Sequence, residues 1–251
     1  MNKKIALVTG ASSGIGRATA KRLAKEGYDL IVCGRRAEKL EELKNEISVE
    51  ARIKILLFDV RSNSHVQKAI ETLPKKWKAI DVLVNNAGNA HGLSSIDRGD
   101  VADWDAMLDG NVKGLLYVSR QVIPLMVNRN SGHIINISSV AGKQTYENGA
   151  VYCASKKAVE ALSEGMRLDL TKHGIKITNI APGAVATEFS EVRFKGDKER
   201  AEKVYEGYEP LLAEDIADLI VYSISRPGRV TIADVTVYAK SQSAPTTIYK
   251  D

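Results

Sequence analysis

The length and composition of the chain exclude several classes of protein. Its 251 residues fit one large α/β domain, and 44% of them are hydrophobic, enough for a sizeable core, which argues against a disordered or fibrous chain. The formal net charge of +5 comes from Lys and Arg residues scattered among acids, so we expect a solvated surface and no nucleic-acid partner.

The cysteines and the N-terminus indicate the compartment. Two cysteines, Cys33 and Cys153, are too few for a disulfide framework, and we expect small core residues in a reducing environment. The opening MNKKIALVTG reaches a glycine after five apolar or small residues, too short a run for a signal peptide. No later apolar run approaches the length that spans a membrane. We therefore expect a cytoplasmic protein without a membrane partner.

Two kinds of pattern alternate along the chain. Short runs rich in β-branched residues predict strands at residues 4–9, 29–33, 53–58, 81–84, 133–137, 176–180 and 234–238. Longer amphipathic stretches predict helices at residues 15–26, 38–48, 63–73, 101–109, 112–128, 151–172 and 213–223. Apolar strands separated by helices are typical of a parallel sheet covered on both faces, with right-handed crossovers. The predicted fold class is therefore α/β, a Rossmann-type doubly wound, seven-stranded parallel sheet with helices on both faces.

The segment at about 187–208 interrupts this alternation with polar and charged residues. It is too long for a simple connection, and long irregular segments in compact domains are usually lids or binding loops. The chain has no internal repeat, low-complexity tract or interdomain linker. We therefore predict a single domain over residues 1–251, with a substrate lid at about 187–208.

A glycine-rich turn follows the first predicted strand. Gly10, Gly14 and Gly16 have the spacing G-x-x-x-G-x-G and not the G-x-G-x-x-G of the common dinucleotide fingerprint. The physical requirement is similar, because a turn without side chains lets the backbone approach a pyrophosphate at a helix N-terminus. An isolated glycine cluster could equally be a structural turn, but its place between a strand and a helix favours a dinucleotide. The expected cofactor contacts here are Gly10, Ser12, Ser13, Gly14, Ile15 and Gly16.

The end of the second predicted strand indicates which dinucleotide binds. NAD-binding units usually carry a carboxylate there for the ribose 2′-hydroxyl, but this chain reads Cys33-Gly34-Arg35-Arg36, with no acid before Glu38. Two guanidinium groups attract a 2′-phosphate. The alternative, a solvated arginine pair, is mildly unfavourable at a helix N-terminus. NADP, bound by Arg35 and Arg36, is therefore the predicted cofactor.

A tyrosine and a lysine share one face of the predicted helix at 151–172. Tyr152 and Lys156 are four residues apart, which puts their side chains one turn from each other. An adjacent ammonium and an oxidised nicotinamide both favour tyrosinate over the neutral phenol, whose ordinary pKa is about 10. Tyr152 is then able to take the proton of an alcohol or donate one to a carbonyl. A lone Y-x-x-x-K is common in helices, so this pair needs further support.

Further motifs accompany the pair in a definite order. They are the glycine turn, Asn85-Asn86-Ala87-Gly88 after the fourth strand, Asn111, Ile137-Ser138-Ser139 after the fifth strand, and Pro182-Gly183 with Val185 and Thr187 after the sixth. Together with Tyr152 and Lys156 they resemble the short-chain dehydrogenase/reductase family, and the resemblance covers nearly the whole chain. Accidental agreement of so many ordered motifs is negligible.

The resemblance implies a role for each matching residue. Tyr152 would be the general acid/base and would contact both the substrate and the cofactor. Lys156 would lower its pKa and hydrogen-bond the nicotinamide ribose. Ser139 would hold the substrate oxygen, and it is preferred to Ser138 because it lies thirteen residues before Tyr152. Asn111 would organise a water chain behind Lys156. The other positions implied to contact the cofactor are Asp59, Val60, Asn86, Ala87, Gly88, Pro182, Gly183, Val185 and Thr187.

The predicted lid points to the substrate. Residues 187–197, with 33–36 and 77–88, look like the NADP-dependent 3-hydroxy acid dehydrogenase branch, which oxidises serine and allo-threonine and reduces malonic semialdehyde. The expected substrate is therefore a small hydroxy acid or the matching carbonyl compound, of the serine, allo-threonine or 3-hydroxypropionate type. An arginine is able to clamp the carboxylate of such an acid bidentately, and Arg193 is the candidate. Its alternative role is a surface or subunit-contact charge.

Three other interpretations stay open. On the same scaffold, the chain could be a 3-oxoacyl-carrier-protein reductase or a broad carbonyl reductase. In another class, it could be a non-catalytic protein that senses NADP, although the complete set of catalytic residues argues against this. The resemblance also implies a homotetramer through the helices at 112–128 and 151–172. We predict no metal site.

Overall fold

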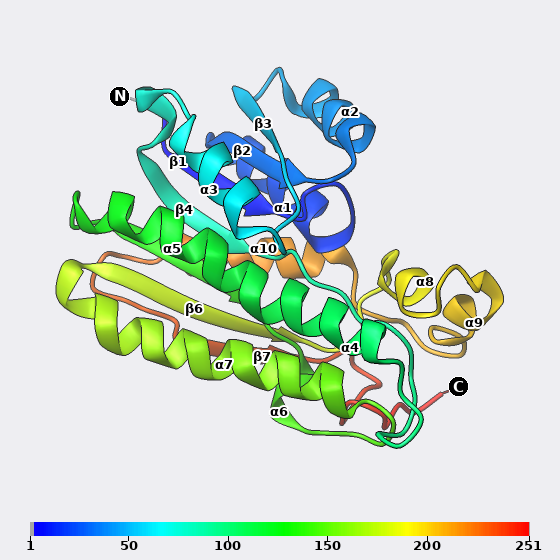
Figure 1. The fold of residues 1–251 in the computed structure, drawn as a ribbon. Coiled ribbons are helices and arrows are strands. Elements are labelled where there is room, and N and C mark those ends of the chain that lie inside the picture. The colour runs from blue at the N-terminus through cyan, green and yellow to red at the C-terminus, as the bar shows by residue number, and fades with distance from the viewer. Residues whose placement is uncertain (1–2, 251) are drawn as a thin grey trace.

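Seven parallel strands form one sheet in the order β3-β2-β1-β4-β5-β6-β7 (Figure 1). The structure is a computed structural model that describes residues 3–250, so residues 1, 2 and 251 of the predicted domain lie outside the described part. The strands are β1 (Ile5–Thr9), β2 (Asp29–Gly34), β3 (Ile53–Leu57), β4 (Ile80–Asn85), β5 (Gly132–Ile137), β6 (Ile175–Pro182) and β7 (Asp234–Val237). The predicted Rossmann-type fold is confirmed.

Helices cover the sheet on both faces, as predicted. They are α1 (Gly14–Lys25), α2 (Ala37–Ile47), α3 (Asn63–Glu71), α4 (Val101–Leu108), α5 (Gly114–Val127), α6 (Val140–Lys143), α7 (Ala150–Leu170), α8 (Phe189–Arg193), α9 (Lys198–Lys203) and α10 (Ala213–Ile224). The sequence did not predict α6, α8 and α9. Each has six residues or fewer, too short to show a helical period. No helix in residues 3–250 is long and apolar enough to cross a membrane.

The two faces of the sheet have separate hydrophobic cores, and β1 contributes to both. Its residues alternate, so that Ala6 and Val8 join one core and Ile5 and Leu7 join the other. All five residues of the strand are buried. This burial on both sides explains why the strands are almost continuously apolar in sequence. Helices α1, α2 and α10 pack on the first face, and α3, α5 and α7 pack on the second.

The strand order reverses between β1 and β4, which are neighbours although two strands separate them in the chain. In a doubly wound sheet such a switch point leaves a crevice at the carboxyl ends of the strands. Segment 187–208 follows β6 at this edge and contains α8 and α9, which lie together at one end of the molecule (Figure 1). The fold therefore brings the glycine turn, the ends of the strands and segment 187–208 to one edge of the sheet.

Candidate active site

One cavity of about 540 Å³ opens at the carboxyl ends of the strands. It begins at the glycine turn after β1 and includes residues at or just after the ends of β2 to β6, with the first turns of α7 and α8. A volume of this size is typical of cofactor and substrate sites. The site residues predicted from sequence that line it are Gly10, Ser12, Ser13, Gly14, Ile15, Arg35, Arg36, Asp59, Val60, Asn86, Ala87, Gly88, Ser139, Tyr152, Lys156, Pro182, Gly183, Val185 and Thr187. Gly16, Asn111 and Arg193 were predicted as well but are not part of this lining.

The glycine turn is packed too closely for side chains. Gly10 has φ +64°, and a Cβ there would lie 2.9 Å from Nδ2 of Asn86. A Cβ on Gly16 would collide with the carbonyl oxygen of Gly10, so Gly16 serves the packing beneath the turn. Asn86 donates from Nδ2 to the carbonyl of Thr9, 2.9 Å away, and thereby holds the end of β1. The absence of side chains leaves the backbone of the turn open to the cavity.

The N-terminus of α1 points its first peptide groups at the same cavity. Ser13 directly precedes the helix, and its hydroxyl accepts a hydrogen bond from Arg36 (2.7 Å) instead of capping the helix. Helix N-termini carry unpaired N–H groups and a partial positive charge, which bind phosphate. On the opposite side, a Cβ on Gly14 would lie 3.2 Å from Cγ2 of Thr187, so the turn and the segment after β6 approach closely. These features fit the pyrophosphate of a dinucleotide.

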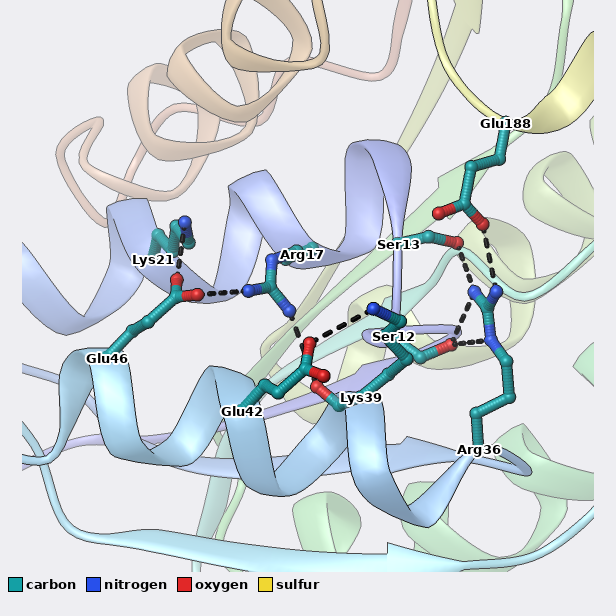
Figure 2. Close-up of polar contacts among 9 residues, drawn as sticks. All are labelled: Ser12, Ser13, Arg17, Lys21, Arg36, Lys39, Glu42, Glu46 and Glu188. Atoms are coloured by element: carbon teal, nitrogen blue, oxygen red, sulfur yellow. Dashed lines mark hydrogen bonds and ion pairs between the residues drawn. The ribbon is translucent and has the colours of Figure 1, made fainter.

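The two arginines after β2 have different surroundings. Arg36 donates to Oγ of Ser12 and Ser13 and pairs with Glu188, as Figure 2 shows. The Arg35 side chain is 64% exposed, and its guanidinium lies 3.7 Å from the carboxylate of Asp59. Both line the cavity, next to the glycine turn. A 2′-phosphate at this place would therefore meet two cations.

Lys156 is buried, and its ammonium faces the end of β5. Its Nζ donates to the carbonyl of Ile137, 3.0 Å away, and only 6% of the residue is exposed. Burial lowers the pKa of Lys156 to about 8, because the charged form loses its hydration. A desolvated ammonium acts strongly on any group that approaches it in the cavity.

Tyr152 lies one helical turn before Lys156, and its ring is also buried. Burial raises the pKa of Tyr152, and the neighbouring Tyr146 adds to this effect. The hydroxyl of Ser139 and the guanidinium of Arg193 act in the opposite direction and lower it. The sequence assigned the lowering of this pKa to Lys156, but the groups that lower it in the structure are Ser139 and Arg193. Burial outweighs them, so the pKa of Tyr152 is raised.

Two adjacent serines follow β5, and their hydroxyls have different partners. The hydroxyl of Ser138 donates to the carbonyl of Lys156 (3.1 Å) and to Oε1 of Glu160 (3.2 Å). Ser139 Oγ accepts from the amide of Ala141 (3.1 Å) at the start of α6. Ser139 is also the serine that acts on Tyr152. Both serines line the cavity, so the choice of Ser139 over Ser138 stays a prediction, supported by the effect of its hydroxyl on the pKa of Tyr152.

Asn111 lies behind the cavity wall, in a π-helical turn at Asp109–Lys113 that joins α4 to α5. The sequence predicted a break between two helices at this point, whereas the structure has the π-helical turn, a local widening that is frequent at functional sites. Asn111 accepts a hydrogen bond from the amide of Asn89 (2.7 Å) and donates to the carbonyl of the same residue (2.8 Å). A Cβ on Gly88 would lie 2.8 Å from Oδ1 of Asn111 and 3.4 Å from Nζ of Lys156. Gly88 thus lies directly between Asn111 and Lys156.

Arg193 ends α8 and is half-buried beside the tyrosine. Its guanidinium donates to the hydroxyl of Tyr146 (3.0 Å) and to the carbonyl of Gly92 (3.3 Å). Its Cζ lies 5.7 Å from the ring centres of both Tyr146 and Tyr152. Arg193 therefore lies behind Tyr152 and forms one wall of a smaller recess, while Phe189 of the same helix contacts the Tyr152 ring at 5.8 Å between centroids.

Sequence reasoning missed several residues that line the cavity. Phe189 and Val192 project into it from α8 at a helical spacing of three, and His91 and Asn89 follow the Asn-Asn-Ala-Gly motif. Glu188, which directly precedes α8, lines it as well. Phe189 and Val192 are apolar residues in a segment rich in polar and charged residues, and this was a usable signal although α8 is too short to show a helical period. No sequence signal marked Glu188, because its partner Arg36 is 152 residues away.

Comparisons with known proteins agree with this picture. The model of the short chain dehydrogenase family matches residues 4–198. An NADP-dependent 3-hydroxy acid dehydrogenase of Salmonella typhi, YdfG, is 44% identical over 240 residues, which cover 95% of this chain and 96% of the relative. Sulfoacetaldehyde reductase 2 of Chromohalobacter salexigens is 40% identical, with 95% of each chain covered. A solved structure described as the closed form of serine dehydrogenase complexed with NADP+ superimposes with a TM-score of 0.92 at 42% identity, over 95% of this chain and 96% of the other.

The fold and the glycine turn define a Rossmann-type dinucleotide-binding architecture. Within that class, the chain belongs to the short-chain dehydrogenase family, since the family model and relatives above 40% identity cover most of its length. The expected family and the expected class of enzyme, a dehydrogenase acting on hydroxyl groups, are confirmed.

Proposed function

We propose that the chain is an NADP-dependent dehydrogenase for small 3-hydroxy acids of the serine, allo-threonine and 3-hydroxypropionate type. The observation that carries the proposal is that Ser139, Tyr152 and Lys156 line the same cavity as the glycine turn. Relatives named NADP-dependent 3-hydroxy acid dehydrogenase and serine dehydrogenase support the choice of cofactor and substrate class.

The residues of the cavity fit NADP along its whole length. The glycine turn and the N-terminus of α1 would hold the pyrophosphate, and Arg35 and Arg36 would hold the 2′-phosphate. Asp59, Val60 and the backbone at 86–88 would line the adenosine side. Lys156 would bind the nicotinamide ribose, and the turn from Pro182 to Thr187 would contact the nicotinamide carboxamide.

The proposed mechanism assigns one proton transfer to Tyr152. Its hydroxyl donates a proton to the carbonyl oxygen during reduction and, as tyrosinate, removes the hydroxyl proton during oxidation. Ser139 would hold the same substrate oxygen, while the Arg193 guanidinium and the Ser139 hydroxyl partly offset the effect of burial, which disfavours tyrosinate. When bound, the cofactor would supply the hydride as NADPH during reduction or accept it as NADP+ during oxidation. Asn111 fixes the wall behind Lys156 and would organise the water that exchanges protons with it.

Arg193 would select substrates that carry an acid group. It lies beside the Tyr152 ring, and one of its terminal nitrogens, Nη1, takes no part in the contacts to Tyr146 and Gly92. A carboxylate two bonds from the reacting carbon is short enough to reach this side of the tyrosine. A sulfonate has the same charge, and a relative is named sulfoacetaldehyde reductase. Reduction of a small sulfonated aldehyde is therefore the second candidate function.

Segment 187–208 would act as the lid of a single domain. Its first helix contributes Phe189 and Val192 to the cavity, and Lys195 pairs with Asp103 on α4 at 3.0 Å. Its position over the nicotinamide end would exclude water from the reacting atoms.

We further propose a cytoplasmic homotetramer. Leu116 on α5 and Leu168 on α7 are 37% and 75% exposed, and these helices are the expected subunit contacts. The two cysteines are too few for a disulfide framework, which supports a reducing compartment. Light scattering on the purified protein tests the assembly, and a monomer would contradict it.

The function is tested by NADP-linked turnover over a defined panel. The panel contains serine, allo-threonine, 3-hydroxypropionate, 3-hydroxybutyrate, sulfoacetaldehyde, simple alcohols and a 3-oxoacyl-carrier thioester, with NAD in place of NADP as the control. We expect the highest kcat/KM for 3-hydroxy acids with NADP. A preference for neutral alcohols or for an acyl-carrier thioester would replace the proposal by a broad carbonyl reductase or a 3-oxoacyl-carrier-protein reductase.

A further inference from the structure

Arg36 joins three segments that are far apart in the chain. Its Nε and one terminal nitrogen contact Oγ of Ser12 at 3.2 and 3.0 Å, and that same terminal nitrogen donates to Oγ of Ser13 at 2.7 Å. Its other terminal nitrogen donates to Oε2 of Glu188 at 2.9 Å. Figure 2 shows the guanidinium between the glycine turn on one side and Glu188 on the other. All three nitrogens of the guanidinium are therefore engaged.

Glu188 differs from the other acid that lines the cavity. Asp59 is held by Arg61 through several hydrogen bonds, with Arg35 farther away at 3.7 Å. Glu188 pairs with Arg36 alone among the described residues. The Glu188 carboxylate is therefore in direct contact with Arg36, one of the two arginines proposed to bind the 2′-phosphate.

A 2′-phosphate that binds Arg36 has to approach this carboxylate. The guanidinium can bind one anion through two parallel hydrogen bonds. A second anion at hydrogen-bond distance from the same guanidinium is repelled by the first anion. A phosphate carries more charge than a carboxylate and forms more hydrogen bonds, so it displaces the carboxylate of Glu188 from Arg36. NAD lacks the 2′-phosphate and therefore has no group that displaces Glu188 from Arg36.

We propose that Glu188 is a specificity-determining residue that competes with the 2′-phosphate of NADP for Arg36. The inference rests on the proposed function, because it takes NADP as the cofactor. Glu188 lowers the affinity for NADP, because the 2′-phosphate has to displace its carboxylate from Arg36. It leaves the affinity for NAD unchanged. Both side chains of the pair are about half exposed, so the effect on affinity is moderate.

Glu188→Gln removes the charge and keeps the shape of the side chain. Isothermal titration of the full-length protein with 2′,5′-ADP and with 5′-AMP isolates the 2′-phosphate from the nicotinamide end. We expect the variant to bind 2′,5′-ADP and NADP about two- to fivefold more tightly, the range of a partly exposed ion pair, and 5′-AMP and NAD as the wild type does. The effect on 2′,5′-ADP should shrink at high salt.

Glu191→Gln is the matched control, since Glu191 belongs to the same short helix and forms no ion pair within residues 3–250. It should change none of the four dissociation constants. Unchanged or weaker binding of 2′,5′-ADP to Glu188→Gln, with a wild type that prefers NADP, overturns the inference and leaves the proposed function intact. A wild type that does not prefer NADP contradicts the proposed cofactor and the inference together.

Discussion

Asn111 donates a hydrogen bond from Nδ2 to Oγ of Ser155, 3.0 Å away, and Ser155 directly precedes Lys156 on α7. Through this bond, the π-helical turn between α4 and α5 holds the helix that carries the proposed proton donor. The same asparagine binds both backbone groups of Asn89 in the cavity wall. The Asn111 side chain thus joins the π-helical turn, helix α7 and the cavity wall at Asn89.

Asn111→Asp should loosen this junction. The substitution keeps the acceptor for the Asn89 amide but loses both donor contacts, and it places a charge in a buried site. We expect the free energy of unfolding to fall by about 1–3 kcal/mol and kcat to fall more than NADP affinity does. Urea denaturation and steady-state kinetics measure the two effects. An unchanged stability with unchanged kcat would show that the junction has no role.

Tyr152→Phe should remove the proton transfer while leaving cofactor binding intact. The ring and its packing against Phe189 remain, and only the hydroxyl is lost. We expect kcat to fall by about 10²–10⁴-fold, the usual contribution of a general acid/base, with little change in the dissociation constant of NADP. Tyr222→Phe serves as the control and should leave kcat unchanged, because it removes the same hydroxyl from an exposed tyrosine on α10. Turnover that survives in Tyr152→Phe would refute the mechanism.

Lys156 should make stability depend on pH in a predictable direction. Its pKa in the folded protein, lowered to about 8 by burial, is below the 10.5 of an ordinary lysine. Between these values the unfolded chain binds more protons than the folded one, so stability rises with pH in this window. Relative to Lys156→Met, the wild type should gain about 2 kcal/mol between roughly pH 7 and pH 9.5.

Urea denaturation at a series of pH values measures this difference. Lys157→Met is the control, since Lys157 is exposed on the same helix and should follow the wild type at every pH. A constant difference between the wild type and Lys156→Met across the window would mean that Lys156 titrates at an ordinary pKa.

Arg193→Met should weaken the binding of acidic substrates specifically. We expect KM to rise at least tenfold for 3-hydroxy acids, the range of a lost charge-assisted hydrogen bond, and much less for neutral alcohols. Because Arg193 also lowers the pKa of Tyr152, the pH profile of kcat should move to higher pH. Lys195→Met removes a charge from the same segment farther from the ring and is the control. Equal effects on acidic and neutral substrates would exclude the clamp.

The sequence predicted the sheet well and the short elements poorly, and the residues explain why. The strands are buried on both faces, so their apolar runs are visible without any partner, as in the five buried residues of β1. Helix α9 has no such pattern. It depends on Asp197, whose side chain accepts a hydrogen bond from the amide of Arg200 at 3.0 Å, and on contacts with α8.

The sequence by itself determined the fold class, the glycine turn and the spacing of Tyr152 and Lys156, because each depends on neighbours within a few residues. Tertiary structure decided the long-range contacts within the candidate site. The contact of Arg36 with Glu188, and of Arg193 with Gly92 across 101 positions, exists only because the parallel sheet brings the ends of its strands to one edge. Charge and burial at such contacts depend on which chain segments meet, and local sequence carries no record of that.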